Sequence, residues 1–208
     1  MEKVKTRDDS ITFYNEAYGE TYHSTSVGAI EEAVKKYVEP ANIRAGMTVL
    51  DFCFGLGYNT LAALAKTHEL RIIAVELDQG ILEKIQETEV PEQYQEDYEK
   101  IKVAARESYY YDEKTVIKLF KGEASGIFTF IKEPIDRVLF DPFSPKKNPE
   151  LWTLDVFQKL FEKMSSGGRL TTFSCARHVR DNLKAAGFRV EDGPILGRKS
   201  PSTVAIKD

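Results

Sequence analysis

Two glycines and an acid between residues 49 and 76 have the types and spacing of a nucleoside-binding site. The segment VLDFCFGLGYNT (49–60) predicts a strand, a tight turn and the start of a helix, and IIAVE predicts a second strand. Gly55 and Gly57 would let the backbone approach a ligand, and Glu76 could accept both ribose hydroxyls. An ordinary strand-to-helix turn would also use such glycines. The acid at the end of the second strand, Glu76, favours a pocket for a nucleoside cofactor over an ordinary turn.

Two further residues of this segment indicate which nucleoside is bound. A dinucleotide site needs a third glycine, and Thr60 stands in that position. Asp51, just ahead of the turn, would repel a phosphate but pair with the ammonium group of an amino acid. S-adenosylmethionine carries that ammonium and has no phosphate. The sequence therefore favours S-adenosylmethionine over a nicotinamide dinucleotide.

The chemistry is expected at the ends of the next two strands. Glu123, in the sequence Gly-Glu-Ala, could accept the adenine amino group, although an acid that begins a helix needs no ligand. The run DPFSPKKNPELW, which starts at Asp141, predicts a rigid loop in which the carboxylate holds an amine and Phe143 packs on the acceptor. Methylation of a pyrimidine carbon usually requires a cysteine nucleophile, and residues 138–152 contain none. Nitrogen is the expected methyl acceptor, although a purely structural proline-rich loop is the alternative.

Composition excludes several classes of protein. The 208 residues carry a net charge of -4, which argues against indiscriminate nucleic-acid binding but allows a local basic face. No apolar run reaches membrane-spanning length, and the N-terminus lacks the apolar centre of a secretion signal, so a cytoplasmic protein is expected. Two separate cysteines and three scattered histidines predict neither a disulfide nor a metal site. One compact domain is expected, with a lead-in and lid over 1–45 and a catalytic domain over 46–208.

The order of predicted elements is typical of a doubly wound α/β fold. Strands are predicted at 47–52, 71–76, 115–120, 135–141, 169–175, 188–192 and 202–206. Helices are predicted at 28–38, 58–67, 79–87, 123–132, 153–165 and 177–186, with Gly167–Gly168 and Gly187 each ending a helix. The last two strands should form an antiparallel edge. The charged, tyrosine-rich segment 88–114 is interpreted as a surface insertion, since its acids would repel a phosphate backbone.

Several motifs of the chain together resemble those of a known family. The segments DSITFYNEAYGETYHS, DFCFGLGYN, GEA, DPFSPKKNPELW and GRK together are similar to the methyltransferase domain of the MnmC-type tRNA-modifying enzymes, over nearly the whole chain. The resemblance implies the class I methyltransferase fold, a seven-stranded, mostly parallel sheet, and S-adenosylmethionine as methyl donor. It also implies methylation of the amine of 5-aminomethyl-2-thiouridine at the wobble position of tRNA. A stand-alone form without the FAD oxidase domain is expected.

The motifs and the resemblance together assign site residues. Asp141 and Phe143 are the expected catalytic residues. The residues expected to bind the donor are Asp51, Phe54, Gly55, Gly57, Asn59, Glu76, Leu77, Glu123, Ala124, Tyr22 and Ser24. Those expected to bind tRNA are Lys146, Lys147, Asn148, Arg177, Arg198 and Lys199, although solvated helix faces would explain the same charges. Cys53 departs from the family, which usually has glycine there, and Glu123 replaces an aspartate.

Three other functions share parts of this pattern. A methyltransferase acting on a small molecule or a protein amine would have every donor motif. An aminopropyltransferase would have the fold but would prefer a decarboxylated donor, for which Asp51 has less use. A non-catalytic module would bind the donor or RNA without turnover.

Overall fold

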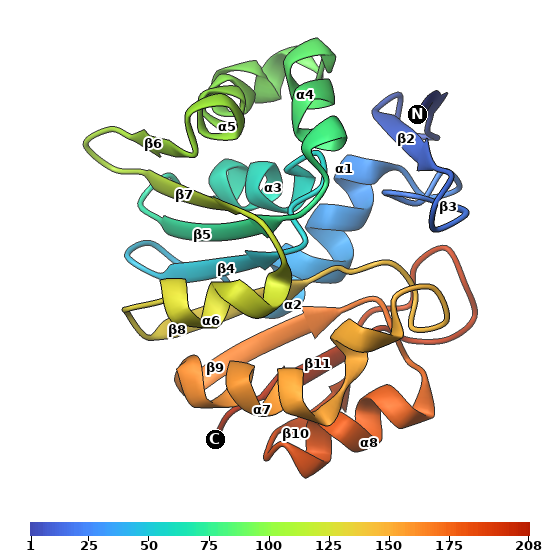
Figure 1. The fold of residues 1–208 in the computed structure, drawn as a ribbon, viewed down its shortest axis with the longest axis vertical. Helices are drawn as coiled ribbons and strands as arrows, with labels where there is room; N and C mark the ends of the chain where they lie inside the picture. Colours follow the sequence, from blue (N-terminus) through green and yellow to red (C-terminus); the bar gives the residue numbers. More distant parts are fainter.

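An eight-stranded sheet forms the centre of the computed structural model, which describes all 208 residues (Figure 1). The strand order is β10-β11-β9-β8-β4-β5-β7-β6, and the five strands from β9 to β7 run parallel. The strands are β4 (Thr48–Phe52), β5 (Arg71–Glu76), β6 (Tyr109–Tyr111), β7 (Val116–Lys121), β8 (Ile135–Phe140), β9 (Met164–Thr172), β10 (Arg189–Asp192) and β11 (Thr203–Ile206). The predicted α/β fold is confirmed, with β6 as an additional edge strand.

Two layers of helices enclose the sheet (Figure 1). One layer contains α1 (Ala29–Glu32), the π-helical segment η1 (Ala33–Val38), α2 (Glu39–Ala41), α3 (Tyr58–Lys66), α4 (Gln79–Glu87), the short 3-10 helix η2 (Glu92–Tyr94) and α5 (Gln95–Glu107). The other contains the 3-10 helix η3 (Ala124–Gly126), α6 (Ile127–Phe130), the 3-10 helix η4 (Pro149–Trp152), α7 (Leu154–Lys163) and α8 (Arg177–Ala185). None of the helices is both long and apolar enough to cross a membrane.

The central strand β4 shows how the sequence produces these two layers. All five of its residues are buried, as expected for a parallel strand covered on both faces. Successive side chains of a strand point to opposite faces. Val49 accordingly packs with α3 and α5, and Leu50 and Phe52 pack with α6 and α7. Burial on both faces therefore fixes β4 in the middle of the molecule and places its carboxyl end at the site.

A small antiparallel sheet lies beside the main one. Its strands are β1 (Glu2–Lys5), β2 (Ile11–Asn15) and β3 (Glu20–Thr21). The hydroxyl of Tyr58, in α3, donates a hydrogen bond of 2.8 Å to the carbonyl oxygen of Ile11. The sequence predicted only a lead-in for this region, because strands of two to five residues carry too little alternation to be detected.

The interpretation of segment 88–114 as a surface insertion is wrong. Its helix α5 buries Tyr98, Ile101, Ala104 and Ala105 in the core of the molecule. The Tyr98 hydroxyl also donates a hydrogen bond of 3.1 Å to the carbonyl oxygen of Leu56, in the glycine turn. These residues recur at helical spacing, but the many charges on the opposite face concealed the pattern. The segment therefore supports the site from behind.

The carboxyl-terminal part differs from the prediction at one point. Strands β10 and β11 form the expected antiparallel edge. Gly187, with a φ of 108°, follows the end of α8 as predicted, and its N–H donates to Lys184 O. Gly167 and Gly168 do not end a helix, because α7 ends at Lys163 and both glycines lie within β9. The register of β9 against β8 shifts between Ile135 and Arg137, so this end of the strand is irregular.

Candidate active site at the carboxyl ends of the strands

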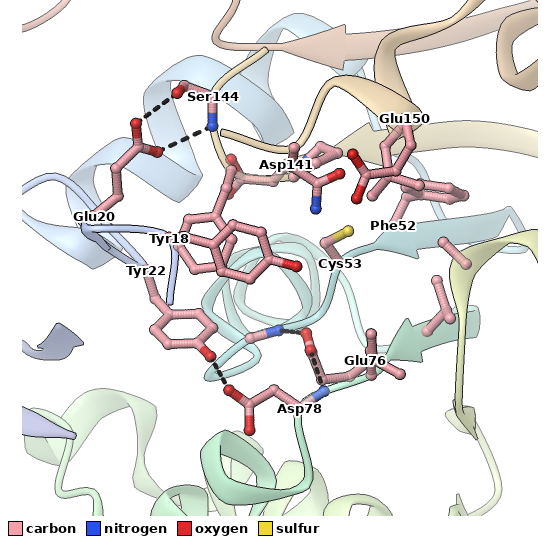
Figure 2. Close-up of a pocket in the computed structure, with 18 of the residues that line it drawn as sticks. Tyr18, Glu20, Tyr22, Phe52, Cys53, Glu76, Asp78, Asp141, Ser144 and Glu150 are labelled. Atoms are coloured by element: carbon pink, nitrogen blue, oxygen red, sulfur yellow. Dashed lines mark hydrogen bonds between the residues drawn. The ribbon is translucent and has the colours of Figure 1, made fainter. Parts of the chain in front are cut away.

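A cavity of about 910 Å³ opens where β4, β5, β7 and β8 end (Figure 2). This volume is in the range that holds a cofactor-sized ligand. The small N-terminal sheet covers one side of the cavity and contributes residues from Tyr14 to Ser24. Open parallel sheets bind ligands at this edge, which is where the sequence placed the site.

The turn after β4 needs glycine for two reasons. Gly55 and Gly57 have φ angles of 55° and 76°, in the left-handed region. A Cβ atom on Gly57 would also lie 2.8 Å from Cγ2 of Ile101 and 2.9 Å from Cζ of Phe54. Cys53 has a φ of 70°, so this cysteine keeps the backbone conformation that favours glycine. Its side chain lines the cavity, and burial raises the pKa of its thiol well above the usual value.

Glu76 links the ends of β4 and β5. One carboxylate oxygen accepts a hydrogen bond from Gly55 N at 2.8 Å, and the other accepts one from Asp78 N, also at 2.8 Å (Figure 2). Burial raises the pKa of the Glu76 carboxyl, and these backbone N–H groups oppose that effect. Each oxygen keeps a further acceptor position. The carboxylate is therefore held in place with capacity left for the hydroxyls of a ribose.

Some of the expected donor-binding residues support the turn from behind. Asp51 is fully buried and does not line the cavity, and its Oδ2 accepts a hydrogen bond of 2.7 Å from the Thr60 hydroxyl. Its Oδ1 has no hydrogen-bond partner. Phe54, Gly57 and Asn59 are also buried behind the cavity wall. The expected donor residues that do line the cavity are Tyr22, Ser24, Gly55, Glu76, Leu77, Glu123 and Ala124.

Asp51 should make stability depend on pH. Burial raises the pKa of its carboxyl to about 7, so the folded chain binds a proton that the unfolded chain releases near its ordinary value of 3.8. The free energy of unfolding should therefore fall as pH rises between these values, by a few kcal/mol at most. Asp51→Asn should flatten this slope in urea unfolding measured across that range. Asp181→Asn, at an exposed carboxylate on α8, should keep the wild-type slope, and equal slopes for Asp51→Asn and the wild type would contradict the assignment.

Asp141 lies in the cavity wall immediately after β8. Its N–H continues the sheet by donating to Phe52 O at 3.0 Å. Its carboxyl group accepts hydrogen bonds from the Tyr37 hydroxyl and from Nδ2 of Asn59, the latter at 3.1 Å. Burial, together with the charge of Glu32, raises the pKa of Asp141 well above its usual value, and the two hydrogen bonds oppose this effect. The site therefore holds a fixed carboxyl group with enhanced affinity for a proton.

The loop that follows Asp141 is held by aromatic and polar contacts. The ring of Phe143 stacks on Tyr18, with centroids 4.3 Å apart, and is tilted against Tyr22 at 5.0 Å. Nε1 of Trp152 donates a hydrogen bond of 2.9 Å to Phe143 O. Asn148, assigned to tRNA binding, is instead buried in the cavity wall, and its Oδ1 has no hydrogen-bond partner.

The N-terminal sheet is attached to both sides of the cavity (Figure 2). The Glu20 carboxylate accepts hydrogen bonds from the hydroxyl and the backbone N of Ser144. The Tyr22 hydroxyl donates to Asp78, which also caps the N-terminus of α4. Sequence reasoning missed Tyr18, Glu20 and Asp78. For Tyr18 and Glu20 the only available signal was the density of aromatic and acidic residues in FYNEAYGETYHS, which did not indicate their distant partners.

The cavity is strongly acidic. Its only lysine or arginine is Lys159, and the acids that line it are Glu20, Glu32, Glu76, Asp78, Glu123, Asp141, Glu150 and Asp155. Such a lining attracts a cationic ligand and repels a pyrophosphate. This charge, together with the glycine turn, fits a sulfonium compound such as S-adenosylmethionine. No three His, Cys, Asp or Glu side chains converge in a way that could hold a metal ion.

The remaining basic residues assigned to tRNA lie outside the cavity. Lys146, Lys147, Arg177 and Lys199 are exposed. Arg198 is half-buried, with its guanidinium carbon 5.9 Å from the centroid of Phe173, which does line the cavity. Buried atoms Nε and Nη2 of Arg198 have no hydrogen-bond partner. These two nitrogens are therefore buried beside the cavity without a partner in the chain, and Arg198 is not part of the cavity lining.

Comparison with known proteins agrees with this geometry. A family model described as S-adenosyl-L-methionine-dependent methyltransferase matches residues 85–208. An uncharacterised protein of Methanocaldococcus jannaschii is 32% identical over 99% of this chain and 59% of its own length. The tRNA 5-methylaminomethyl-2-thiouridine biosynthesis bifunctional protein MnmC of Leptospira interrogans is 27% identical over 93% of this chain and 33% of its own. The chain thus spans less than two thirds of these relatives.

A solved structure extends the comparison to three dimensions. The crystal structure of MnmC2 from Aquifex aeolicus matches 99% of this chain and 70% of that one, with 34% identity and a TM-score of 0.87. A precorrin-6y C5,15-methyltransferase from Geobacter metallireducens, at 14% identity and a TM-score of 0.55, shares the fold. The chain therefore belongs to the S-adenosyl-L-methionine-dependent methyltransferases, in the family of the MnmC methyltransferase domain.

Proposed function

We propose that this protein transfers a methyl group from S-adenosylmethionine to the amine of 5-aminomethyl-2-thiouridine at the wobble position of tRNA. The observation that carries the proposal is the position of Asp141 in the wall of an acidic cavity, across from Glu76 (Figure 2). Phe143 lines the same cavity. The names of the MnmC relatives support tRNA as the acceptor. Action on tRNA would place the protein in the cytoplasm.

The donor side of the cavity would hold S-adenosylmethionine, which supplies a methyl group on positively charged sulfur when bound. Glu76 would accept hydrogen bonds from the ribose hydroxyls, because both its oxygens are fixed by backbone N–H groups. Glu123, exposed at the rim after β7, would accept the adenine amino group, with Leu77 and Ala124 beside it. The left-handed turn at Gly55 would receive the methionine end.

The acceptor side would bind the aminomethyl group against Asp141. An amine must lose its proton before it can attack carbon, and the raised pKa of Asp141 suits it to receive that proton. Tyr37 and Asn59 hold the carboxyl group in position, and Phe143 would pack against the uracil ring. Methyl transfer needs mainly alignment of the reacting atoms, which a fixed loop supplies. The reaction would therefore depend on positioning and on one proton acceptor.

Two basic loops beside the cavity would bind the tRNA backbone. The charge reversals Lys146→Glu and Lys147→Glu, combined with Arg198→Glu and Lys199→Glu, should weaken tRNA binding and flatten its dependence on salt, because fewer counterions are released. Filter binding over a salt titration would measure both quantities. Lys66→Glu with Lys114→Glu is the control, because Lys66 is an exposed lysine that ends α3 and Lys114 is an exposed lysine that precedes β7. Equal salt slopes for the two variants would remove this surface from the proposal.

Methyl incorporation into separated cell fractions tests the acceptor class. Purified protein and radiolabelled S-adenosylmethionine would be incubated with bulk tRNA, with total protein and with small metabolites. The proposal predicts label in tRNA that bears aminomethyluridine and none in tRNA from cells that cannot make it. Label in protein or small molecules would support another N-methyltransferase, and no label with measurable donor binding would support a non-catalytic module.

A further inference from the structure

His23 is a buried histidine in the cavity wall for which the proposed reaction gives no role. It follows β3, is 7% exposed and lines the cavity. Its backbone N donates to the Thr12 hydroxyl at 3.1 Å, and its ring meets the Tyr58 ring edge-on at 5.0 Å. The backbone and the ring are thus each held by a contact, yet Nε2 of the ring has no hydrogen-bond partner. A buried ring nitrogen without a partner is costly unless a ligand satisfies it.

The position of Nε2 indicates which part of a ligand it meets. A Cβ atom built on Gly55 would lie 3.7 Å from Nε2 of His23, so the imidazole adjoins the glycine turn. The turn is where the methionine end of the donor is expected, whereas Glu76 and Glu123 are expected to hold the ribose and adenine. His23 therefore faces the amino-acid part of the donor.

The charges of the cavity show which group at that end needs a partner. The cavity lining contains many carboxylates that could pair with the ammonium group, including Glu32. It contains only one lysine that could pair with the methionine carboxylate. That lysine, Lys159, is already paired with Asp155 at 2.7 Å, on helix α7. A carboxylate in this cavity must therefore be bound mainly by uncharged N–H and O–H donors.

We propose that His23 binds the carboxylate of the donor's methionine end through its Nε2–H and thereby selects S-adenosylmethionine over its decarboxylated form. Burial lowers the pKa of His23 to about 4, against the opposing charges of Glu32 and Asp8, so the ring is uncharged at neutral pH and carries one N–H. The inference rests on the methyl donor and is independent of the tRNA acceptor. It makes the N-terminal sheet part of the donor site.

Calorimetric titration with S-adenosylmethionine and decarboxylated S-adenosylmethionine tests this role, because the two ligands differ only in the carboxylate. The wild type should prefer S-adenosylmethionine. His23→Leu should weaken its binding about 10- to 100-fold, as expected for loss of one hydrogen bond to a charged group, and leave binding of the decarboxylated form unchanged. His23→Gln, which keeps an N–H donor, should restore most of the lost affinity.

Other outcomes would overturn the proposal. Equal losses for both ligands would give His23 a structural role only, and no loss for either would place the carboxylate elsewhere. Thermal unfolding of each variant would identify a folding defect, and His178→Leu, at an exposed histidine on α8, is the matched control. Because tRNA is absent from the titration, failure here would leave the proposed acceptor untouched, and failure of methyl transfer to tRNA would leave this result untouched.

Discussion

Asp141→Asn is expected to lower the maximal rate of methyl transfer by about 100- to 10,000-fold, the range typical of a lost general base. The asparagine keeps the size of the side chain and can still accept a hydrogen bond from the Tyr37 hydroxyl or Asn59. It cannot take a proton from the substrate amine. Single-turnover incorporation of labelled methyl into tRNA would measure the effect, and donor affinity should stay close to that of the wild type.

Two comparisons separate this effect from a folding defect. Asp181→Asn makes the same chemical change at an exposed aspartate on α8, and this variant should keep full activity. Unfolding of Asp141→Asn in urea should show a stability at least equal to that of the wild type near neutral pH, since burial disfavours the ionised carboxyl. Full turnover by Asp141→Asn would mean that the proton leaves by another route and that the catalytic assignment is wrong.

The second large effect is expected on donor binding. Glu76→Ala should reduce the affinity for the donor about 100-fold or more. The substitution leaves the N–H groups of Gly55 and Asp78 without their acceptor and removes the proposed contact with the ribose. Each unsatisfied buried group costs about 1–3 kcal/mol, and the turn would lose its support. Calorimetric titration with S-adenosylhomocysteine would measure the loss.

The control for this variant is Glu87→Gln, at an exposed acid that ends α4, which should bind the donor like the wild type. Glu76→Ala should recover part of its activity at high donor concentration, because Asp141 and its partners remain in place. Unchanged affinity in Glu76→Ala would show that the ribose lies elsewhere in the cavity.

The features predicted from the sequence are those with a local signature. Each of the strands β4, β5, β7 and β8 is a short, mostly apolar segment between turn residues, so it is recognisable without knowledge of its neighbours. Gly55 and Gly57 predict the turn. Glu76 ends β5, and Asp141 follows β8 directly. Because parallel strands align their carboxyl ends, these residues must meet at one edge of the sheet. The local sequence patterns of the strands, together with the alignment of their carboxyl ends, therefore locate the site.

The features that could not be predicted depend on contacts between distant residues. Tyr37 and Asp141 are 104 residues apart, and Glu20 and Ser144 are 124 residues apart. Neither pairing has a local signature: the motif identifies Asp141, but nothing near it in the sequence indicates Tyr37 as its partner. The same reason explains why the docking of the N-terminal sheet could not be predicted, since it depends on the contact between Tyr22 and Asp78. Asp51 shows the converse case, in which a motif residue turns its carboxylate to Thr60 behind the cavity wall.

Nucleoside analysis of the wobble position tests the central claim most directly. tRNA carrying 5-aminomethyl-2-thiouridine would be incubated with the protein and S-adenosylmethionine, digested, and separated with mass detection. The proposal predicts conversion of that nucleoside into 5-methylaminomethyl-2-thiouridine, with a mass gain of one methylene unit, and no conversion by Asp141→Asn. An unchanged wobble nucleoside, with the methyl group found at another position of the tRNA, would contradict it.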